Sequence, residues 1–366
     1  MTDAPPRILA NPRPGTPGLV VLPAGGYRRA RAEITAWPGY APTPLHDLPA
    51  LAAKLGIATL RVKDEATRFG LGSVKALGGA YAVLGVIAAE LARQGVIAGA
   101  TADELEAGRY RDATQSITVT CATAGNHGQS VAWGARRFGG RAVIFVHPGV
   151  SPAQRDAMAA LGAEIREVPG SYDDAVHAAA AETAMHVISD TSWPGYTEIP
   201  RDIMQGYRLM PDEALTQWTG PPPTHVLIQA GVGGIAAAVS VQLRAHGITP
   251  ALIVVEPDHA ACLYASASAG HAVTVPGPHD TLMTGLACGT PSLLAWQELE
   301  RSATAFVTIP DSSTVAAMGV LAGHGIVSGP SGAAGLGALM LLGQENALGI
   351  GPESRVLLFS CEGLNK

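Results

Sequence analysis

The feature of this sequence that most constrains its fold is a regular alternation of short apolar runs with longer, alanine-rich segments. The apolar runs occupy residues 58–62, 117–120, 142–146, 164–168, 226–229, 252–255 and 356–359. Parallel strands covered by helices on both faces have this continuous apolar character, because neither face meets water. The alternation therefore predicts βα units and an α/β fold whose mainly parallel sheets are flanked by helices.

The chain is 366 residues long, and a single core stops growing at roughly 250 to 300 residues. We therefore expect two lobes. The proline-rich residues 220–224 favour a lobe boundary, and a second crossing is expected after the helix that begins near Ser73. The two ends, 1–92 and 210–366, should together form the larger lobe, and residues 93–209 the smaller one.

The charge balance argues against several classes of partner. The chain has 24 basic and 30 acidic side chains, a formal net charge of −6, and no basic run of the kind that binds nucleic acid. The most membrane-like stretch, 226–243, is interrupted by a glycine turn and contains Gln229, Ser240 and Gln242, which predicts a buried strand and helix. The N-terminus lacks the apolar core of a signal peptide. We expect a cytoplasmic protein that acts on a small molecule, with no nucleic-acid or membrane partner.

The cysteines Cys121, Cys262, Cys288 and Cys361 are scattered along the chain. They lack the close pairing of a zinc site, so no metal site is expected. Free thiols are the simplest interpretation. A bridge between Cys262 and Cys288 stays open, because sequence alone cannot place two sulfur atoms within bonding distance.

A lysine lies where a helix is expected to begin. Residues 68–80 form a glycine-bearing loop that leads into a helical run, and Ser73 is suited to cap that helix. Lys75 then lies in the first turn, where the positive end of the helix dipole helps its amine to lose a proton. Such an amine can attack an aldehyde. The alternative is an ordinary exposed lysine.

A glycine turn follows the apolar run 226–229 and precedes a second helical run. The turn and the helix start comprise Gly231, Val232, Gly233, Gly234 and Ile235. Backbone N–H groups at such a turn can bind a phosphate, and glycine allows close approach. No Gly-Lys-Ser/Thr follows, and the spacing differs from that of a dinucleotide site. The turn is a candidate phosphate site of another kind.

A third loop joins the run 117–120 to a helical segment, and it contains Thr123, Ala124, Gly125, Asn126 and His127. Its helix start and the Thr123 hydroxyl suit the carboxylate of an amino acid. Asn126 adds a donor amide. A hydrogen-bonded structural role for His127 is as good an interpretation as a catalytic one.

Ser360 ends the last apolar run. Ligands in open α/β sheets bind beyond the carboxyl ends of the strands, so this hydroxyl should reach the same crevice as the three loops. A turn or helix cap is the alternative.

In this order, the Ser-x-Lys, Thr-x-Gly-Asn-His and glycine-loop elements resemble the fold-type II pyridoxal-5'-phosphate (PLP) enzymes, the group of the threonine and serine dehydratases and the tryptophan synthase β-chain. More narrowly, the chain is similar to the diaminopropionate ammonia-lyases. The segments that carry this resemblance are 38–45, 63–65, 68–71, 75–79, 190–200 (Asp-Thr-Ser-Trp-Pro-Gly-Tyr-Thr-Glu-Ile-Pro), 204–207 and 285–289. The resemblance implies that the larger lobe binds PLP and the smaller lobe binds substrate.

The resemblance also implies a role for each candidate residue. Lys75 would hold PLP as a Schiff base, Asn126 would bond its phenolic oxygen, and the glycine turn, from Gly231 to Ile235, would hold its phosphate. Ser360 would face the pyridine nitrogen, where a neutral hydroxyl suits elimination. Asp190 would lie beside the amino groups of the substrate, although a plain turn residue is the alternative. Thr123, Ala124, Gly125 and His127 would bind the substrate, and a homodimer is the family habit.

Two features depart from the family pattern. Diaminopropionate ammonia-lyases usually read Asp-Gly-Asn-His in the third loop, and that aspartate is thought to take the α-proton of the D-enantiomer. This chain has Ala124 there, which cannot accept a proton, so activity on a D-substrate is in doubt. The sequence also stops at Lys366, where the family tends to continue, which could change a dimer contact.

The resemblance implies α,β-elimination on a β-substituted L-amino acid, with 2,3-diaminopropionate, giving pyruvate and ammonia, as the first substrate to test. Three alternatives stay open. They are elimination of a different β-group, β-replacement by a second nucleophile, and a catalytically silent protein that binds PLP or an amino acid.

Overall fold

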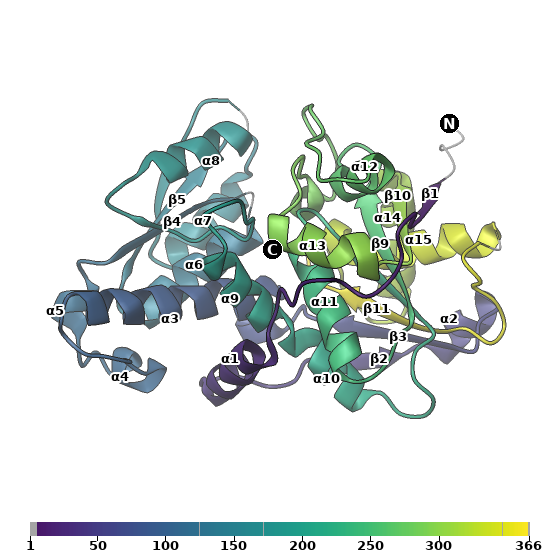
Figure 1. The fold of residues 1–366 in the computed structure, drawn as a ribbon, viewed down its shortest axis with the longest axis horizontal. Coiled ribbons are helices and arrows are strands. Elements are labelled where there is room, and N and C mark those ends of the chain that lie inside the picture. Colours follow the sequence, from purple (N-terminus) through teal and green to yellow (C-terminus); the bar gives the residue numbers. More distant parts are fainter. Residues whose placement is uncertain (1–5, 124, 171, 346, 365–366) are drawn as a thin grey trace. The chain divides into compact units, whose positions relative to one another are not determined.

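The computed structural model describes residues 6–123, 125–170, 172–345 and 347–364. They form two compact units (Figure 1). Unit 1 contains the chain up to Pro23, Pro42–Val74 and Tyr207–Leu364, and unit 2 contains Ala24–Ala41 and Lys75–Gly206. Residues 24–41 and 75–92 therefore cluster with the middle of the chain, whereas the sequence suggested boundaries near 92 and 210. The division into a cofactor-binding and a substrate-binding domain stays a prediction.

Unit 1 is built on a mainly parallel sheet with the strand order β1-β10-β9-β8-β11-β3-β2. Its strands are β1 (Arg7–Ala10), β2 (Leu45–Asp47), β3 (Thr59–Asp64), β8 (His225–Gln229), β9 (Ala251–Pro257), β10 (Ala305–Ile309) and β11 (Arg355–Ser360). The edge strands β1 and β2 are antiparallel to their neighbours, and the other pairs are parallel. The inner strands β3, β8, β9 and β11 match continuous apolar runs, whereas the buried strand β10 was not among those predicted, and the expected α/β fold is confirmed.

Helices cover both faces of this sheet. They are α2 (Pro49–Lys54), η1 (Arg68–Gly70), α10 (Leu209–Gln217), α11 (Gly234–Ala245), α12 (Cys262–Ala269), η2 (Thr284–Leu286), α13 (Leu293–Ser302), α14 (Asp311–Gly323) and α15 (Pro330–Gln344). The apolar helix α15 contacts β8 to β11, and Leu336 shares a core cluster with Leu227 and Leu358. Alternate strand residues point to the other face, where Phe306 of β10 meets Trp296 of α13.

Unit 2 is built on a parallel sheet with the order β6-β5-β4-β7. Its strands are β4 (Thr118–Ala122), β5 (Arg141–Val146), β6 (Glu164–Glu167) and β7 (His186–Val187). Its helices are α1 (Ala24–Ala36), α3 (Lys75–Arg93), α4 (Ala102–Glu106), α5 (Arg111–Thr114), α6 (Asn126–Arg137), α7 (Pro152–Ala160), α8 (Tyr172–Ala181) and α9 (Glu198–Tyr207). The strands thus alternate with helices here as well.

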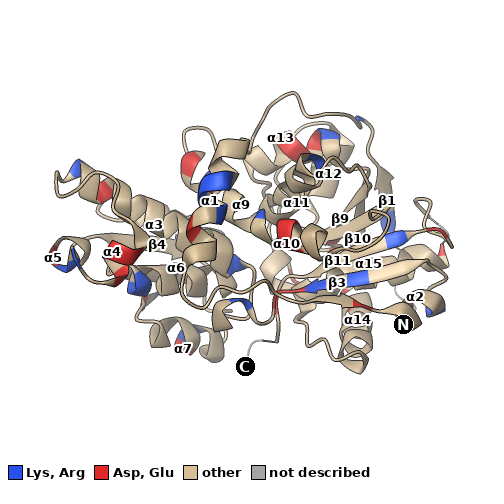
Figure 2. Ribbon diagram, turned by 90° about the horizontal axis from the view of Figure 1, so that it is seen from below, with Lys and Arg blue, Asp and Glu red and all other residues tan. Residues whose placement is uncertain are grey.

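The helices α3 and α6 approach each other very closely in unit 2. A Cβ atom built on Gly79 would lie 2.4 Å from Ser130 Oγ, and one built on Gly134 would lie 2.9 Å from Ala80 Cα. Only glycine fits at these two positions without moving the partner helix. By length and composition α3 could cross a membrane, but most of it is buried inside the protein, as is usual for a core helix. Charged residues of both signs are interspersed along the elements of each unit (Figure 2).

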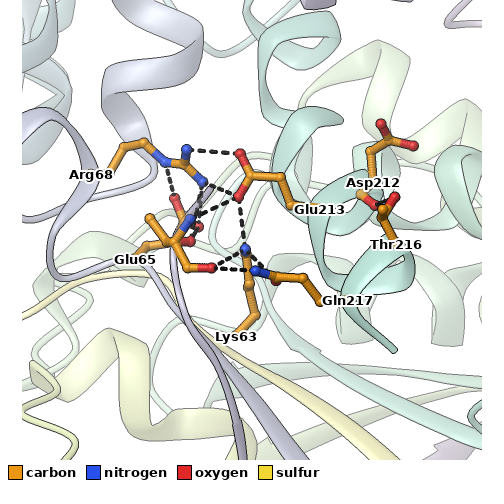
Figure 3. A network of polar contacts seen from close by, with 8 residues as sticks. Lys63, Glu65, Arg68, Asp212, Glu213, Thr216 and Gln217 are labelled. Carbon is orange, nitrogen blue, oxygen red and sulfur yellow. Dashed lines mark hydrogen bonds and ion pairs between the residues drawn. The ribbon is translucent and has the colours of Figure 1, made fainter. Parts of the chain in front are cut away.

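A buried network of charges ties β3 to α10 in unit 1 (Figure 3). Arg68 donates to both carboxylate oxygens of Glu213 at 2.8 Å and to Glu65 at 2.8 Å. Lys63 Nζ lies 2.7 Å from Glu213 and donates to the Thr43 carbonyl at 2.6 Å. All four charged side chains are buried. Two cations and two carboxylates therefore compensate one another out of water.

Burial shifts the pKa values of Lys63 and Glu213, and the ion pairs within the network act against these shifts. Burial lowers the pKa of Lys63, although Glu213 and Glu65 act in the other direction. Burial would raise the pKa of Glu213, but Arg68 and Lys63 hold it below its usual value.

Phe69 follows Arg68 with φ of 50°, a left-handed conformation that is uncommon outside glycine and needs support from its surroundings.

Replacing Glu213 by alanine should destabilise the protein by about 3 to 5 kcal/mol, because it leaves Lys63 and Arg68 buried without their shared counter-ion. Urea denaturation measures this change. Glu300→Ala is the control, since Glu300 pairs with Arg13 at 3.1 Å with both side chains partly exposed, and it should cost less than about 1 kcal/mol. Equal losses for the two variants would contradict the assignment.

Candidate active site

The carboxyl ends of two parallel strands bring candidate residues to one edge of the unit 1 sheet. The register pairs Val356 with His225 and Leu358 with Leu227, which places Ser360 level with Gln229. The glycine turn begins two residues after Gln229. The expected convergence at the strand ends therefore holds for Ser360 and the glycine turn.

The glycine turn is shaped for close approach by an anion. Gly233 is the N-cap of α11, with φ of 97° and no hydrogen bond from a side chain. The first backbone bond into the helix runs from Ala237 N–H to Gly233 O at 2.9 Å. The N–H groups of the first turn thus lack intrahelical acceptors, as at any helix start, and lie at the positive end of the dipole.

The residues on either side of Gly233 pack tightly against neighbouring parts of unit 1. A Cβ atom on Gly231 would lie 3.0 Å from Cys288 Sγ, 3.2 Å from Leu286 Cα and 3.3 Å from Gly285 O. The Val232 carbonyl accepts from Ser292 N–H at 2.9 Å, and Ile235 is the second residue of α11. This packing explains why position 231 is glycine, and it fixes the turn as a rigid cradle.

The two cysteines whose pairing the sequence left open flank this turn as free thiols. Cys262 Sγ lies 3.5 Å from Gly231 O. Burial raises the pKa of the Cys262 thiol well above its usual value, so this thiol stays protonated at neutral pH.

Ser360 is fully buried and is part of a network of neutral hydroxyls. Its Oγ donates to Ser328 Oγ at 2.9 Å, and Ser328 donates to the Gly329 carbonyl at 3.1 Å. A neutral hydroxyl in this position can donate a hydrogen bond to an unprotonated ring nitrogen or accept one from a protonated ring nitrogen. The role of Ser360 toward the pyridine nitrogen stays a prediction.

In unit 2, Lys75 is the first residue of α3 and is paired with Asp190. Lys75 Nζ lies 2.7 Å from Asp190 Oδ2, with the side chains 19% and 16% exposed. Burial would raise the pKa of Asp190, but the charge of Lys75, the charge that His127 carries when it is protonated in acid, and the Lys75 hydrogen bond outweigh it and bring this pKa to about 2. Asp190 is therefore ionised at neutral pH, and the sequence-based concern that Lys75 is an ordinary exposed lysine does not hold.

The backbone of Lys75 is fixed by a residue that sequence reasoning missed. Ser130 Oγ, on α6, donates to the Lys75 carbonyl at 2.7 Å and accepts from Ala80 N–H at 3.1 Å. The hydroxyl fits there only because residue 79 is glycine. Ser130 lies one helical turn after Asn126 and so on the same face of α6, which is the signal that could have identified it. Ser73, the expected cap of α3, pairs with Glu362 in a short antiparallel bridge.

The third loop is held together by its own threonine. Thr123 is buried, and its Oγ1 accepts from the N–H groups of Gly125 at 3.0 Å and Gly128 at 3.2 Å. Asn126 is the first residue of α6. Ala124 lies outside the described residues. Substrate binding by this loop stays a prediction, and its shape comes from the threonine hydroxyl.

His127 has a structural partner. Its Nε2 lies 2.7 Å from the Ile188 carbonyl, and because a carbonyl can only accept, Nε2 carries the proton. Burial lowers the pKa of His127, so the ring is neutral at pH 7. This geometry favours the structural interpretation of His127 over the catalytic one.

With this geometry in place, comparison with known proteins identifies the class. Residues 36–362 match the model of the family described as pyridoxal-phosphate dependent enzymes, and the chain belongs to that family. It is 39% identical over 350 residues to the diaminopropionate ammonia-lyase of Escherichia coli K12, covering 89% of this chain and 85% of that protein. The Salmonella typhimurium LT2 enzyme of the same name is 37% identical, with 89% and 86% covered.

Solved structures agree with the narrower resemblance. The Escherichia coli diaminopropionate ammonia-lyase in complex with an aminoacrylate-PLP azomethine intermediate superimposes with a TM-score of 0.88 at 35% identity, covering 99% of this chain and 94% of that chain. Threonine deaminase isoform 2 of Solanum lycopersicum, at 20% identity and a TM-score of 0.75, shares the fold. The expected family and cofactor are confirmed.

The described residues fit PLP group by group. The phosphate suits the turn from Gly231 to Gly234 at the start of α11, where a Cβ atom on Gly231 would lie 3.0 Å from Cys288 Sγ and one on Gly233 would lie 3.0 Å from Ala295 Cβ. The aldehyde suits the amine of Lys75, which an ionised carboxylate contacts. The ring nitrogen suits the buried neutral hydroxyl of Ser360. No observation in the described residues conflicts with these assignments.

In the PLP-free protein, the Lys75–Asp190 pair should make the free energy of unfolding depend on pH in the acid range. The pKa of Asp190 is lowered from 3.8 to about 2 on folding, so its stabilising contribution is present above pH 3.8 and is lost as the pH falls toward 2. A shift of this size corresponds to about 2 kcal/mol. The difference in unfolding free energy between the wild type and Asp190→Asn should therefore shrink between about pH 5 and pH 2.5. Urea titrations across this range measure it, and a constant difference would refute the ion pair.

Proposed function

We propose that this protein is an ammonia-lyase that eliminates the β-amino group of L-2,3-diaminopropionate and releases pyruvate and ammonia. The observation that carries the proposal is the Lys75–Asp190 ion pair at the start of α3, in a chain 39% identical to diaminopropionate ammonia-lyase over most of its length. Lys75 is the proposed point of covalent attachment for PLP. When bound, PLP supplies an electron sink that weakens the bond between the α-carbon and its hydrogen.

In this mechanism the amine of Lys75 acts as the base. Nζ takes the α-proton, the electron pair of the Cα–H bond forms the Cα–Cβ double bond, and the β-ammonium group leaves as ammonia. The resulting enamine takes up one water and gives pyruvate and a second ammonia. Asp190 holds the charge that Lys75 gains, because it is ionised and 2.7 Å away.

We assign substrate recognition to the same carboxylate and to the third loop. Diaminopropionate carries one more amino group than serine, and Asp190 supplies a negative charge that suits a cationic amino group. The helix start that follows Thr123 and Gly125 suits the substrate carboxylate. Binding the carboxylate and the amino groups at separate places fixes the orientation of the α-proton.

We further propose that the enzyme is a cytoplasmic homodimer. A homodimer is the commonest closed assembly of soluble oligomers, and light scattering on the purified protein tests it.

Lys75→Ala should lose both covalent PLP and most turnover. A positioned general base contributes typically 10² to 10⁴ in rate, so kcat should fall by at least about that factor. Borohydride reduction followed by mass spectrometry should place the cofactor on the peptide that contains Lys75 in the wild type. Lys54→Ala is the control, because Lys54 is exposed at the end of α2. Full activity of Lys75→Ala would end the proposal.

The enantiomer preference tests the meaning of Ala124. With no carboxylate at this position, the enzyme should release pyruvate from L-2,3-diaminopropionate and little from the D-form. Ala124→Asp should raise turnover of the D-form while the L-form is still consumed. A panel of L- and D-β-substituted amino acids, scored for 2-oxo acid with and without a thiol acceptor, also separates elimination from β-replacement. Equal rates on the two enantiomers in the wild type would contradict a single-base mechanism.

A further inference from the structure

The segment that leads to Asp190 is held by the hydroxyl of a single tyrosine. Tyr196 Oη donates to the Val187 carbonyl at 2.7 Å and accepts from Ser189 N–H at 3.0 Å. These two backbone groups lie on either side of Ile188. The phenol therefore clamps the chain immediately before Asp190, and it belongs to the same unit as Asp190 and Lys75.

The clamp is itself rigid. Trp193 and Tyr196 form an antiparallel bridge, with hydrogen bonds of 3.2 and 2.9 Å in the two directions. Their rings stack with centroids 4.2 Å apart and planes inclined by 15°. Gly195 closes the turn with φ of 88°, a left-handed conformation that glycine adopts without strain. The bridge and the stacking thus fix the ring of Tyr196 independently of the two hydrogen bonds that its hydroxyl makes.

Ile188 completes the anchorage of the segment to the sheet. Its N–H donates to the Thr120 carbonyl of β4 at 2.7 Å, and its carbonyl accepts from His127 Nε2. Backbone groups of Val187, Ile188 and Ser189 are therefore all bound, and the next residue is Asp190. The position of the carboxylate that contacts Lys75 depends on these bonds.

We propose that Tyr196 is a positioning residue for the lyase reaction, because its hydroxyl fixes the chain that holds the Asp190 carboxylate on the Lys75 amine. This inference rests on the proposed function and deepens it. Tyr196 acts through Asp190 and is not assigned a contact with the substrate.

Three titratable groups lie near the Lys75–Asp190 pair. They are His127 on α6, Cys121 on β4 and Tyr196 on the segment after β7, whereas Lys75 itself begins α3. Burial raises the pKa of Tyr196, and the nearby Asp190 charge acts in the same direction, so its hydroxyl stays a donor at neutral pH. Burial likewise raises the pKa of Cys121. Asp190 is the anion among these residues.

The test uses Tyr196→Phe, which keeps the stacked ring and removes both hydrogen bonds of the hydroxyl. In the holoenzyme, kcat/KM for L-2,3-diaminopropionate should fall by about 10- to 100-fold, the loss typical of a displaced catalytic group. In the PLP-free protein, ¹³C-methylation of lysines followed by NMR gives the titration midpoint of Lys75, assigned from the resonance that Lys75→Ala lacks. This midpoint should move down, in the same direction as in Asp190→Asn, because a displaced carboxylate stabilises the ammonium less.

Two further variants make the result specific. Tyr110→Phe is the matched control, since Tyr110 precedes α5 in the same unit and its side chain makes no cap hydrogen bond, and it should leave both readouts unchanged. In an Asp190→Asn background, Tyr196→Phe should add little to either loss, because the two residues act through one carboxylate.

An unchanged Lys75 midpoint in folded Tyr196→Phe, or a full additional loss in the Asp190→Asn background, overturns the positioning role. If Tyr196→Phe does not fold, Trp193→Leu carries the test: it removes the ring that stacks on Tyr196, and Trp193 is itself 38% exposed, so the midpoint should shift in the same direction. An unchanged midpoint there overturns the proposal. A wild type that releases no ammonia from any amino acid refutes the proposed function alone, because the NMR titration needs no turnover.

Discussion

The proposed chemistry of this protein depends on an ion pair between two residues that are far apart in sequence. Lys75 and Asp190 lie 2.7 Å apart, and each is placed by backbone bonds. Ser130 holds the carbonyl of Lys75, and Tyr196 holds the groups on either side of Ile188. A reactive amine needs this precision, because its nitrogen must point at the proton that it removes and must be uncharged when it does so. The parallel sheet of unit 2 is the frame on which both ends are fixed.

The sequence predicted the inner parts of the fold better than its edges. Continuous apolar runs identified β4, β5, β8, β9 and β11, because strands buried on both faces are poor in polar residues. The strands β3 and β6 were predicted as well, although β6 consists of Glu164, Ile165, Arg166 and Glu167 and is partly exposed. The strands β1, β2 and β7 are short and partly exposed, so their composition carries little signal. β10, Ala305–Ile309, was missed although it is fully buried. It is a short run within an apolar-rich stretch, and periodicity alone cannot separate such a strand from a helix.

The candidate site divides in the same way into local and tertiary parts. The glycine turn and Lys75 were recognised because a strand, a turn and a helix start are consecutive in sequence. The turn carries its chemistry in backbone N–H groups, and Lys75 carries its chemistry in an amine at a helix start. Asp190 entered only through the family resemblance, since nothing near it in sequence shows that it meets Lys75. Ser130 and Tyr196 were missed because the backbone groups that their hydroxyls bond are set by the fold, and the spacing of Ser130 from Asn126 shows only that the two share a helix face. The structural interpretation of His127 needed the Ile188 carbonyl to be located.

The contrast between two lysines shows how the fold selects which amine can react. Lys63 is fully buried and is held by Glu213, the Thr43 carbonyl and Gln217. Its nitrogen has no remaining direction from which a carbonyl carbon could approach, since an ammonium has three donors and all three are used. Lys75 contacts the Asp190 carboxylate, and its side chain is 19% exposed. A side chain that is partly exposed leaves room for its nitrogen to exchange a proton and form a bond, which is what covalent attachment of a cofactor requires.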